Sequence, residues 1–318
     1  MNNRLFEAKL YILKALTNLH VGSGEASYSV IDKQVQRDIL TNHPQINSSS
    51  LKGALREYMT FKAFKREKGV DSLRTTDIIF GSEPNASDNN QKARQGYVNF
   101  HDAKLLSLPI RTDQKPFVRA TSKEILSEYI AYCKKFNWDT NIDKEMIESF
   151  EYGYDVGDHT GMMRAEDWEY KASSNLKNLK ELIGADIILL RDEDFRILSK
   201  DLPFIARNYL ENGKSENLWY EEIVPRESLF YFVIEKPVDD VLAYKALKDT
   251  NPLLGSNAKQ QSKKDKQVRD KFDEFDLALH NAQFYIGANT TVGYGLCEVS
   301  LFMTKDDTQG ASDEPKAD

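Results

Sequence analysis

The order of the expected strands and helices constrains the fold of this chain more than any other feature. Alternating or uniformly apolar segments predict strands, and longer segments with apolar residues at helical spacing predict helices. Strands are expected at 6–19 and 97–110 around a helix at about 51–68, and strands at 227–236 and 284–302 around a helix at 264–280. Two strand–helix–strand units separated by a long excursion are the order of a split βαβ, ferredoxin-like core.

We therefore predict an α+β fold, with a ferredoxin-like (RRM-like) palm made of an antiparallel sheet with helices on one face. A glycine-punctuated stretch at about 137–225 is expected to form a large inserted, thumb-like region, and the polar stretch at about 82–95 a surface loop. Residues 1–303 are predicted to form a single domain. The acidic residues 304–318 are poor in apolar side chains and are expected to be a disordered tail.

Composition narrows the class of protein. With 318 residues, 40% of them hydrophobic, the chain is long enough for a sizeable core and has no apolar run long enough for a membrane helix. Met1 to Leu10 do not read as a secretory signal. Cys133 and Cys297 are far apart and have no CxxC partner, which is typical of a cytoplasmic protein and disfavours a thiolate zinc site. We expect a cytoplasmic protein without a membrane partner.

Charge is unevenly distributed, so the net charge of −7 does not exclude a nucleic-acid partner. The helix expected at 51–68 carries six basic residues against only Glu57 and Glu67. A solvated helix face explains such a run equally simply. A basic patch on this helix is nevertheless a candidate surface for phosphate groups.

Two segments have the composition of phosphate-binding elements. Residues Gly287 to Gly295 form a glycine-rich turn between two expected strands, where exposed backbone N–H groups could receive a phosphate. Ser48 to Gly53 open the basic helix with three hydroxyl groups and Lys52 in the first turn, and helix N-termini attract anions. A tight hairpin turn and an ordinary N-cap are the alternative interpretations.

Asp32 is a candidate catalytic carboxylate because of its position. It lies in the loop between the first strand and the start of the basic helix, with His20 a short distance upstream. Histidine and aspartate together can perform acid–base chemistry or bind a metal ion. Proximity in sequence does not establish contact, and the residues alone favour His20 as a packed residue at the end of the strand.

Several segments, taken in order, resemble the repeat-associated (RAMP) proteins of CRISPR systems. More closely, the chain resembles the backbone subunits of type III-B (Cmr) effector complexes. The resemblance rests on the following segments: His20–Gly24, Ser29–Asp32 with Gln36–Arg37, Pro44, Ser49–Arg56, Ile79–Gly81, Val98–Leu106, Leu108–Arg111, Leu218–Glu222 and Gly287–Gly295. The family usually has glycine just before the serines, where this chain has Asn47, a residue that also tolerates a left-handed backbone.

The resemblance implies an endoribonuclease that acts within a guide-RNA complex. Such subunits stack in a helical filament on a guide RNA, assemble with other Cmr subunits and cut the complementary target RNA at regular intervals. The family's catalytic aspartate falls on Asp32, which would also bind a divalent metal ion, Mg²⁺ or Mn²⁺. The implied RNA-binding residues are His20, Arg37, Ser49, Lys52, Arg56, Gly287, Gly293 and Gly295.

The chemistry implied is attack by a 2′-hydroxyl on the adjacent phosphate, which gives a 2′,3′-cyclic phosphate and needs in-line geometry. Asp32 would bind the metal ion or accept the hydroxyl proton, and the inserted region would distort one nucleotide. Two other functions remain open at this point. One is a catalytically silent RNA-binding scaffold, and the other is a metal-independent ribonuclease that processes guide RNA through His20.

Overall fold

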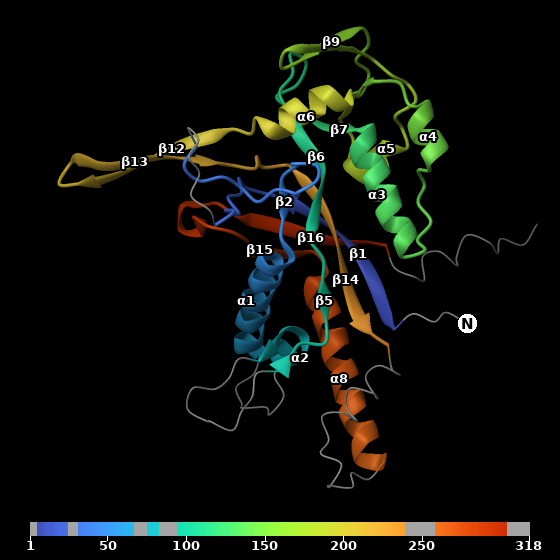
Figure 1. The fold of residues 1–318 in the computed structure, drawn as a ribbon. Helices are drawn as coiled ribbons and strands as arrows, with labels where there is room; N and C mark the ends of the chain where they lie inside the picture. Colours follow the sequence, from blue (N-terminus) through green and yellow to red (C-terminus); the bar gives the residue numbers. More distant parts are fainter. Residues whose placement is uncertain (1–4, 25–30, 67–74, 83–93, 239–257, 304–318) are drawn as a thin grey trace, which may run out of the picture.

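The protein is described by a computed structural model that covers residues 5–24, 31–66, 75–82, 94–238 and 258–303 (Figure 1). It has the expected α+β composition, with helices packed on a large mixed sheet. The predicted tail at 304–318 and most of the predicted loop at 82–95 lie outside the described residues. None of the helices in the described ranges is long and apolar enough to cross a membrane.

The central sheet runs in the order β15-β16-β1-β14-β6-β7-β11-β8. Strands β1, β14, β16 and β6 pair antiparallel with their neighbours, and short strands β2 and β5 join β6 and β14 at the side. The bounds are Phe6–Ala15 (β1), Gln45–Ile46 (β2), Asn99–Phe100 (β5), Ala103–Ile110 (β6), Leu229–Pro237 (β14), Ala282–Tyr285 (β15) and Leu296–Met303 (β16). The strands expected from the apolar pattern are therefore all present.

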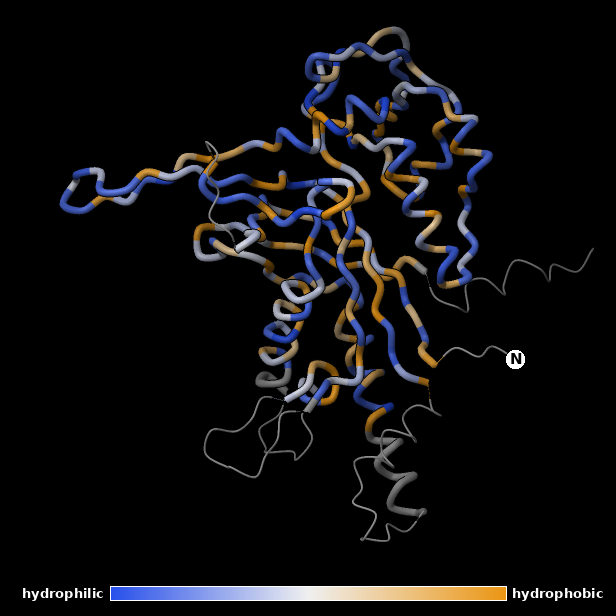
Figure 2. The backbone as a smooth tube through the Cα atoms, viewed as in Figure 1, coloured by the Kyte–Doolittle hydropathy of each residue, from blue (hydrophilic) through white to orange (hydrophobic). Residues whose placement is uncertain are grey.

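The sheet is covered on both faces, which differs from the prediction of helices on one face. Successive side chains of a strand point to opposite faces. On one face of β14, Tyr231 packs edge-on against Tyr129 of helix α3 (Lys123–Lys135). On the other face lies Ile234, whose register partner Phe100 contacts Phe275 of helix α8 (Ala258–Leu279). This explains why β14 is apolar without alternation, and Figure 2 shows the hydrophobic central strands.

Part of the predicted insertion extends the central sheet. Strand β11 (Ile187–Leu190) pairs parallel with β7 (Val118–Ser122) and antiparallel with β8 (Gly153–Asp155), so the sheet is not wholly antiparallel. A parallel pair needs a long crossover, which the segment between β7 and β11 provides. This lobe also contains α4 (Lys144–Ser149), β9 (Met162–Ala165), β10 (Trp168–Lys171), α5 (Leu179–Ile183) and α6 (Asp192–Lys200).

The rest of the insertion is a long hairpin of strands β12 (Phe204–Glu211) and β13 (Lys214–Glu222). Figure 1 shows that it extends away from the body of the molecule, with its base next to the segment that follows β1. At its tip, Asn212 and Gly213 both have positive φ angles (53° and 80°), as a tight two-residue hairpin turn requires.

Helix α1 (Ser48–Arg66) begins slightly earlier than predicted and packs beside α2 (Thr75–Phe80). The two-stranded pair β3 (Gly81–Ser82) and β4 (Arg94–Gln95) follows α2. The Tyr58 hydroxyl of α1 donates to the carbonyl of Ala278 at 3.1 Å, near the end of α8. This contact joins the helices of the two strand–helix–strand units.

Candidate active site and nucleic-acid interface

The segment that carries Asp32 is fixed against the end of the hairpin strand β13. The backbone N–H of Lys33 donates to Tyr220 O at 3.1 Å, and the N–H of Glu222 donates to Lys33 O at 2.9 Å. The Asp32 carboxylate accepts a hydrogen bond from the backbone N–H of Tyr220 at 2.8 Å and remains exposed to solvent. The candidate catalytic group is therefore accessible and held at the base of the hairpin.

Glu221 links three chain segments beneath Asp32. Its buried carboxylate accepts hydrogen bonds from Trp219 Nε1 (2.8 Å), Lys33 Nζ (3.0 Å), Asn289 Nδ2 (2.8 Å) and Arg207 Nε (3.2 Å). Burial by itself would raise the pKa of Glu221. The hydrogen bonds from Trp219, Lys33 and Asn289, together with the charge of Lys33, outweigh burial and lower this pKa to about 2. Glu221 is therefore ionised and ties the hairpin to both loops.

Glu222 holds Arg37 and His20 in the same cluster. Its carboxylate accepts from Arg37 Nη2 and from the backbone N–H of Val35 at 3.0 Å, and its carbonyl accepts from His20 Nδ1 at 2.7 Å. Arg37 also donates to the carbonyl of Ser199 at 2.9 Å. The His20 side chain is only 3% exposed. Both side chains were expected to contact RNA, but their contacts here support the loops around Asp32.

The glycine loop adjoins His20. Gly287 has φ +85°, and a Cβ there would lie 2.5 Å from His20 O, while the next residue, Ala288, donates its N–H to that oxygen at 2.9 Å. A Cβ on Gly295 (φ +87°) would lie 2.4 Å from Ile286 O. Only glycine fits these two sites, because both the backbone conformation and the space exclude a side chain.

The tip of the glycine loop is open. It contains the 3₁₀ turn Thr290–Val292 and Gly293, all exposed, and a Cβ on Gly293 (φ +88°) would meet nothing within 4 Å. The turn predicted from sequence therefore forms, and its tip could approach a phosphate. Gly287 and Gly295 shape the loop from within.

At the start of α1, Lys52 and Ser49 are accessible to a ligand. The carboxylate of Asp102 already accepts a hydrogen bond from the first turn of this helix. Asp102 Oδ1 accepts from the backbone N–H of Ser48 at 2.6 Å, which fills one of the sites expected to attract an anion. Ser49 is exposed. Burial, together with the nearby charge of Arg56, lowers the pKa of Lys52, and no carboxylate of the described residues pairs with it. Because it has no carboxylate partner among the described residues, the ammonium group of Lys52 is available to an anion.

Gln36 connects the start of α1 to the segment of Asp32. Its side-chain amide donates to Ser50 Oγ at 2.9 Å and accepts from the backbone N–H of Asn47 at 2.8 Å. Arg56 points elsewhere, because its guanidinium donates to the carbonyl of Phe80 at 2.8 Å, in the Ile79–Gly81 segment. Arg56, expected at the RNA surface, thus anchors α2 to α1.

The carboxylates present do not form a metal centre that fits the expected Mg²⁺ or Mn²⁺. Within the described parts of the chain, no three His, Cys, Asp or Glu side chains lie close enough to bind a metal ion together. Both oxygens of Glu221 are engaged by protein donors, and Asp32 is a single exposed carboxylate. Mg²⁺ needs six oxygen ligands, and proteins commonly supply one or two carboxylates while waters and substrate phosphates supply the others. Asp32 could supply only one.

The buried acidic pair Glu221 and Glu222 and its partners were not predicted from the sequence. Glu221 and Glu222 were named only as the end of the Leu218–Glu222 segment, and no role was predicted for Asn289 or Arg207. Two adjacent carboxylates at the end of a strand normally point to opposite faces. This signal was present in the sequence, but the identity of their partners depends on contacts across nearly the whole chain.

The sequence of this chain matches a known protein family. The model of the RAMP superfamily matches residues 12–298, and the chain belongs to this superfamily. The CRISPR system Cmr endoribonuclease Cmr4 of Pyrococcus furiosus is 28% identical over 317 residues, covering 93% of this chain and 96% of the relative. The CMR subunit Cmr4 of Saccharolobus solfataricus is 24% identical over 70% of this chain and 82% of the relative.

Solved structures show the same fold. A chain of the type III-B Cmr-beta complex bound to cognate target RNA aligns with a TM-score of 0.63 and 20% identity, covering 93% of this chain and 98% of that one. Oligomeric Cmr4 from Pyrococcus furiosus aligns with a TM-score of 0.58 and 20% identity, covering 94% and 99%. The expected membership of the RAMP superfamily is confirmed.

Proposed function

We propose that this chain is a repeating backbone subunit of a Cmr-type CRISPR complex that binds guide RNA and cleaves the complementary target RNA. The relative from Pyrococcus furiosus is a Cmr endoribonuclease, and it aligns over nearly the full length of both chains. The observation that carries the catalytic part is the exposed Asp32 carboxylate, fixed by Tyr220 beside the glycine loop. Copies of this chain and other Cmr subunits are the protein partners, and a cytoplasmic location follows from this role.

RNA is held through phosphates in this proposal. Lys52 supplies a cation with no carboxylate partner among the described residues, and Ser49 supplies an exposed hydroxyl group. The N–H of Gly293 donates to Thr290 O at 3.1 Å, so the exposed tip at Gly293 contributes close approach of its backbone and not a free donor. Phosphate contacts position a strand without reading its sequence, which base pairing with the guide provides. His20, Arg37, Gly287 and Gly295 maintain the shape of this interface, and Arg56 fixes α2 against the helix that carries Lys52.

Cleavage would proceed through the target RNA's own 2′-hydroxyl. The Asp32 carboxylate accepts the proton as the 2′-oxygen attacks the adjacent phosphorus, and the bond to the 5′-oxygen of the next nucleotide breaks. The products are a 2′,3′-cyclic phosphate and a 5′-hydroxyl end, once the leaving oxygen has received a proton from solvent. Holding the nucleotide in line supplies a large part of the rate enhancement in such reactions. No step is assigned to a metal ion.

The fold fits this role as a palm and a thumb within one domain, residues 1–303. The order β16-β1-β14-β6, with α1 following β1 and α8 following β14, supports a ferredoxin-like palm. The hairpin β12–β13 is the element that we assign as the thumb. Its base carries Tyr220 and Glu221 beside Asp32, so a nucleotide displaced by the hairpin would lie near the carboxylate.

The experiment compares wild type with Asp32→Asn in the complex assembled on its guide, using an end-labelled complementary RNA. Asparagine keeps an oxygen that can accept from Tyr220, so the loop should keep its position. We expect a regularly spaced ladder of products from wild type and its loss in the variant, with target binding unchanged. An undiminished ladder would identify the chain as a scaffold. Cleavage of free guide precursor by the isolated chain, abolished by His20→Ala, would instead favour guide processing.

A further inference from the structure

Lys33 follows Asp32 directly, and β13 holds the side chains of both residues. The Asp32 carboxylate accepts from the backbone N–H of Tyr220 at 2.8 Å, and Lys33 Nζ donates to Glu221 Oε1 at 3.0 Å. The ammonium group also lies 4.9 Å from the centre of the Trp219 ring, within the range of a cation–π contact. Two neighbouring residues of one strand therefore hold a carboxylate and a cation at the base of the thumb hairpin.

The Lys33 ammonium group can bind an anion without leaving Glu221. Its side chain is 53% exposed. A lysine ammonium has three N–H donors, and in the described part of the chain Glu221 is its hydrogen-bond acceptor. Glu221 does not depend on Lys33 alone, because Trp219 and Asn289 also donate to its carboxylate. Contact between Lys33 and a ligand is therefore compatible with the cluster that holds Asp32.

Two arginines of the same cluster are engaged by the protein. The Arg37 side chain is 15% exposed, and its guanidinium donates to the Glu222 carboxylate and to two carbonyl groups at the end of α6. The Arg207 guanidinium lies 4.8 Å from the centre of the Tyr294 ring, and its Nη2 atom is buried. Neither arginine can turn toward a ligand without giving up these contacts.

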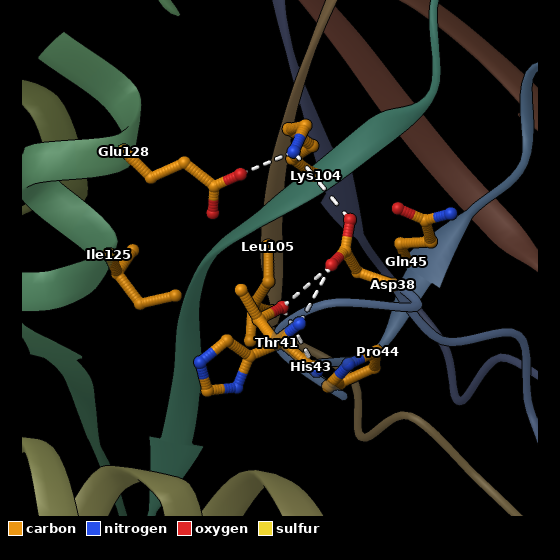
Figure 3. Close-up of a pocket in the computed structure, with 9 residues that line it drawn as sticks. All are labelled: Asp38, Thr41, His43, Pro44, Gln45, Lys104, Leu105, Ile125 and Glu128. Carbon is orange, nitrogen blue, oxygen red and sulfur yellow. Dashed lines mark hydrogen bonds and ion pairs between the residues drawn. The ribbon is translucent and has the colours of Figure 1, made fainter. Parts of the chain in front are cut away.

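Lys104, which contacts the segment that follows Asp32, is engaged as well. Figure 3 shows it between Asp38 and Glu128, and it forms ion pairs with both carboxylates. Its side chain is 24% exposed. Of these four described cations, Lys33 therefore has the most exposed side chain, and it is the direct neighbour of Asp32.

We propose that Lys33 is a second catalytic residue of the cleavage reaction, and this inference rests on the proposed function. Its ammonium group binds a non-bridging oxygen of the scissile phosphate. As the 2′-oxygen attacks, negative charge builds up on the non-bridging oxygens of the five-coordinate phosphorus, and a cation held in place stabilises this charge. Lys33 keeps its protons throughout. The 2′-hydroxyl proton goes to Asp32, and the leaving 5′-oxygen takes its proton from solvent.

The test uses the complex assembled on its guide, with targets that carry one phosphorothioate at a single cut site. The two diastereomers are separated, so that sulfur replaces one non-bridging oxygen or the other. Sulfur accepts hydrogen bonds weakly, so wild type should cut one diastereomer about 10-fold more slowly than the other. Lys33→Ala should cut the unmodified target on the order of 100-fold more slowly, and its preference between the diastereomers should disappear.

Two variants control for structural effects. Lys33→Arg keeps the positive charge and a donor for Glu221, so it should retain most of the cleavage rate and the diastereomer preference. Lys14→Ala removes another ion-paired lysine, which binds Glu227 at 2.9 Å, and should leave the rate and the preference unchanged. Target binding should be the same in every variant, because base pairing with the guide holds the target.

Each result decides the proposal. Cleavage at the wild-type rate by Lys33→Ala would overturn it, and so would equal cleavage of the two diastereomers by wild type. A slow Lys33→Ala variant that keeps the wild-type preference would also overturn it, because Lys33 would then act through the structure alone. If Asp32→Asn still abolishes cleavage in these cases, the proposed function stands without Lys33. A wild-type complex that does not cut would remove the proposed function and this inference together.

Discussion

The carboxylate of Asp32 and the backbone N–H of Tyr220 are joined by a 2.8 Å hydrogen bond, although 187 residues separate them in sequence. The neighbouring bonds between Lys33 and β13 make this a short stretch of paired backbone. Asp32 therefore moves with the hairpin. We therefore expect a ligand that bends the hairpin to displace the candidate catalytic group as well.

Lys52 is predicted to contribute to RNA affinity through its charge. Lys52→Ala should weaken binding of the full chain to single-stranded RNA and reduce the slope of log K against log salt by about 0.7, as expected for one lost phosphate contact. Filter binding over a range of salt concentrations measures both quantities. Lys177→Ala is the matched control, because Lys177 is exposed in the lobe, away from α1. Equal slopes for both variants and wild type would contradict a phosphate contact at Lys52.

Gly287 is predicted to be essential for the shape of the glycine loop. Gly287→Ala introduces a left-handed alanine and places its Cβ 2.5 Å from His20 O, so it should lower the free energy of unfolding by more than 2 kcal/mol, estimated roughly. Gly293→Ala has the same backbone conformation without a close neighbour and should cost only about 1 kcal/mol. Urea unfolding measures both values. Similar losses of unfolding free energy in the two variants would contradict the prediction, because they would mean that the backbone near His20 shifts to accommodate the Cβ of Gly287→Ala.

Within the described residues, the protein does not supply a complete set of metal ligands, and we therefore predict weak metal binding. The RNA-free chain should bind Mn²⁺ only weakly, and Asp32→Asn should not change the affinity measurably, because one carboxylate is a poor site. Electron paramagnetic resonance of free Mn²⁺ during a titration measures this directly. A single tight site that disappears in Asp32→Asn would contradict the prediction and would require ligands from outside the described residues.

The fold was largely predictable because its signals are local. Strands β1 and β14 and the helices α1 and α8 follow from apolar spacing, and the glycine turn follows from residues that tolerate positive φ. The parallel pairing of β7 with β11 was not predictable, because a buried apolar run does not specify the direction of its neighbour. For the same reason α3 was not assigned to the second face of the sheet.

The candidate site was predictable in its residue types and only partly in their roles. Asp32 and the tip of the glycine loop are exposed to solvent, and their use in binding or catalysis stays a prediction. The resemblance implied that His20 and Arg37 bind RNA, although the residues alone favoured His20 as a packed residue at the end of the strand. The structure buries His20 and engages Arg37 through Glu222, a contact between residues 185 positions apart. Long-range pairing of this kind leaves no local pattern in a single sequence.

Glu221 is predicted to act as a positioning residue for Asp32, and its ionisation supplies a pH-dependent test. Because its folded pKa of about 2 lies below the ordinary value of 4.5, the ionised group stabilises the fold above pH 4.5 and loses this effect as the pH falls toward 2. The contribution of Glu221 to the free energy of unfolding should fall by roughly 2 kcal/mol between pH 6 and pH 3. Glu221→Gln cannot ionise, so its free energy of unfolding should approach that of wild type at pH 3.

Activity separates positioning from general stability. In the assembled complex, Glu221→Gln should slow target cleavage on the order of 100-fold at neutral pH, because the Lys33 contact that holds the Asp32 segment is weakened. Target binding should stay unchanged. Glu227→Gln is the matched control: Glu227 is also a partly buried, ion-paired carboxylate, held by Lys14 and Arg119 away from Asp32. If both variants lose the same stability but only Glu221→Gln loses cleavage, the effect is positional. Equal losses of cleavage in Glu221→Gln and Glu227→Gln would show that Glu221 has only a structural role.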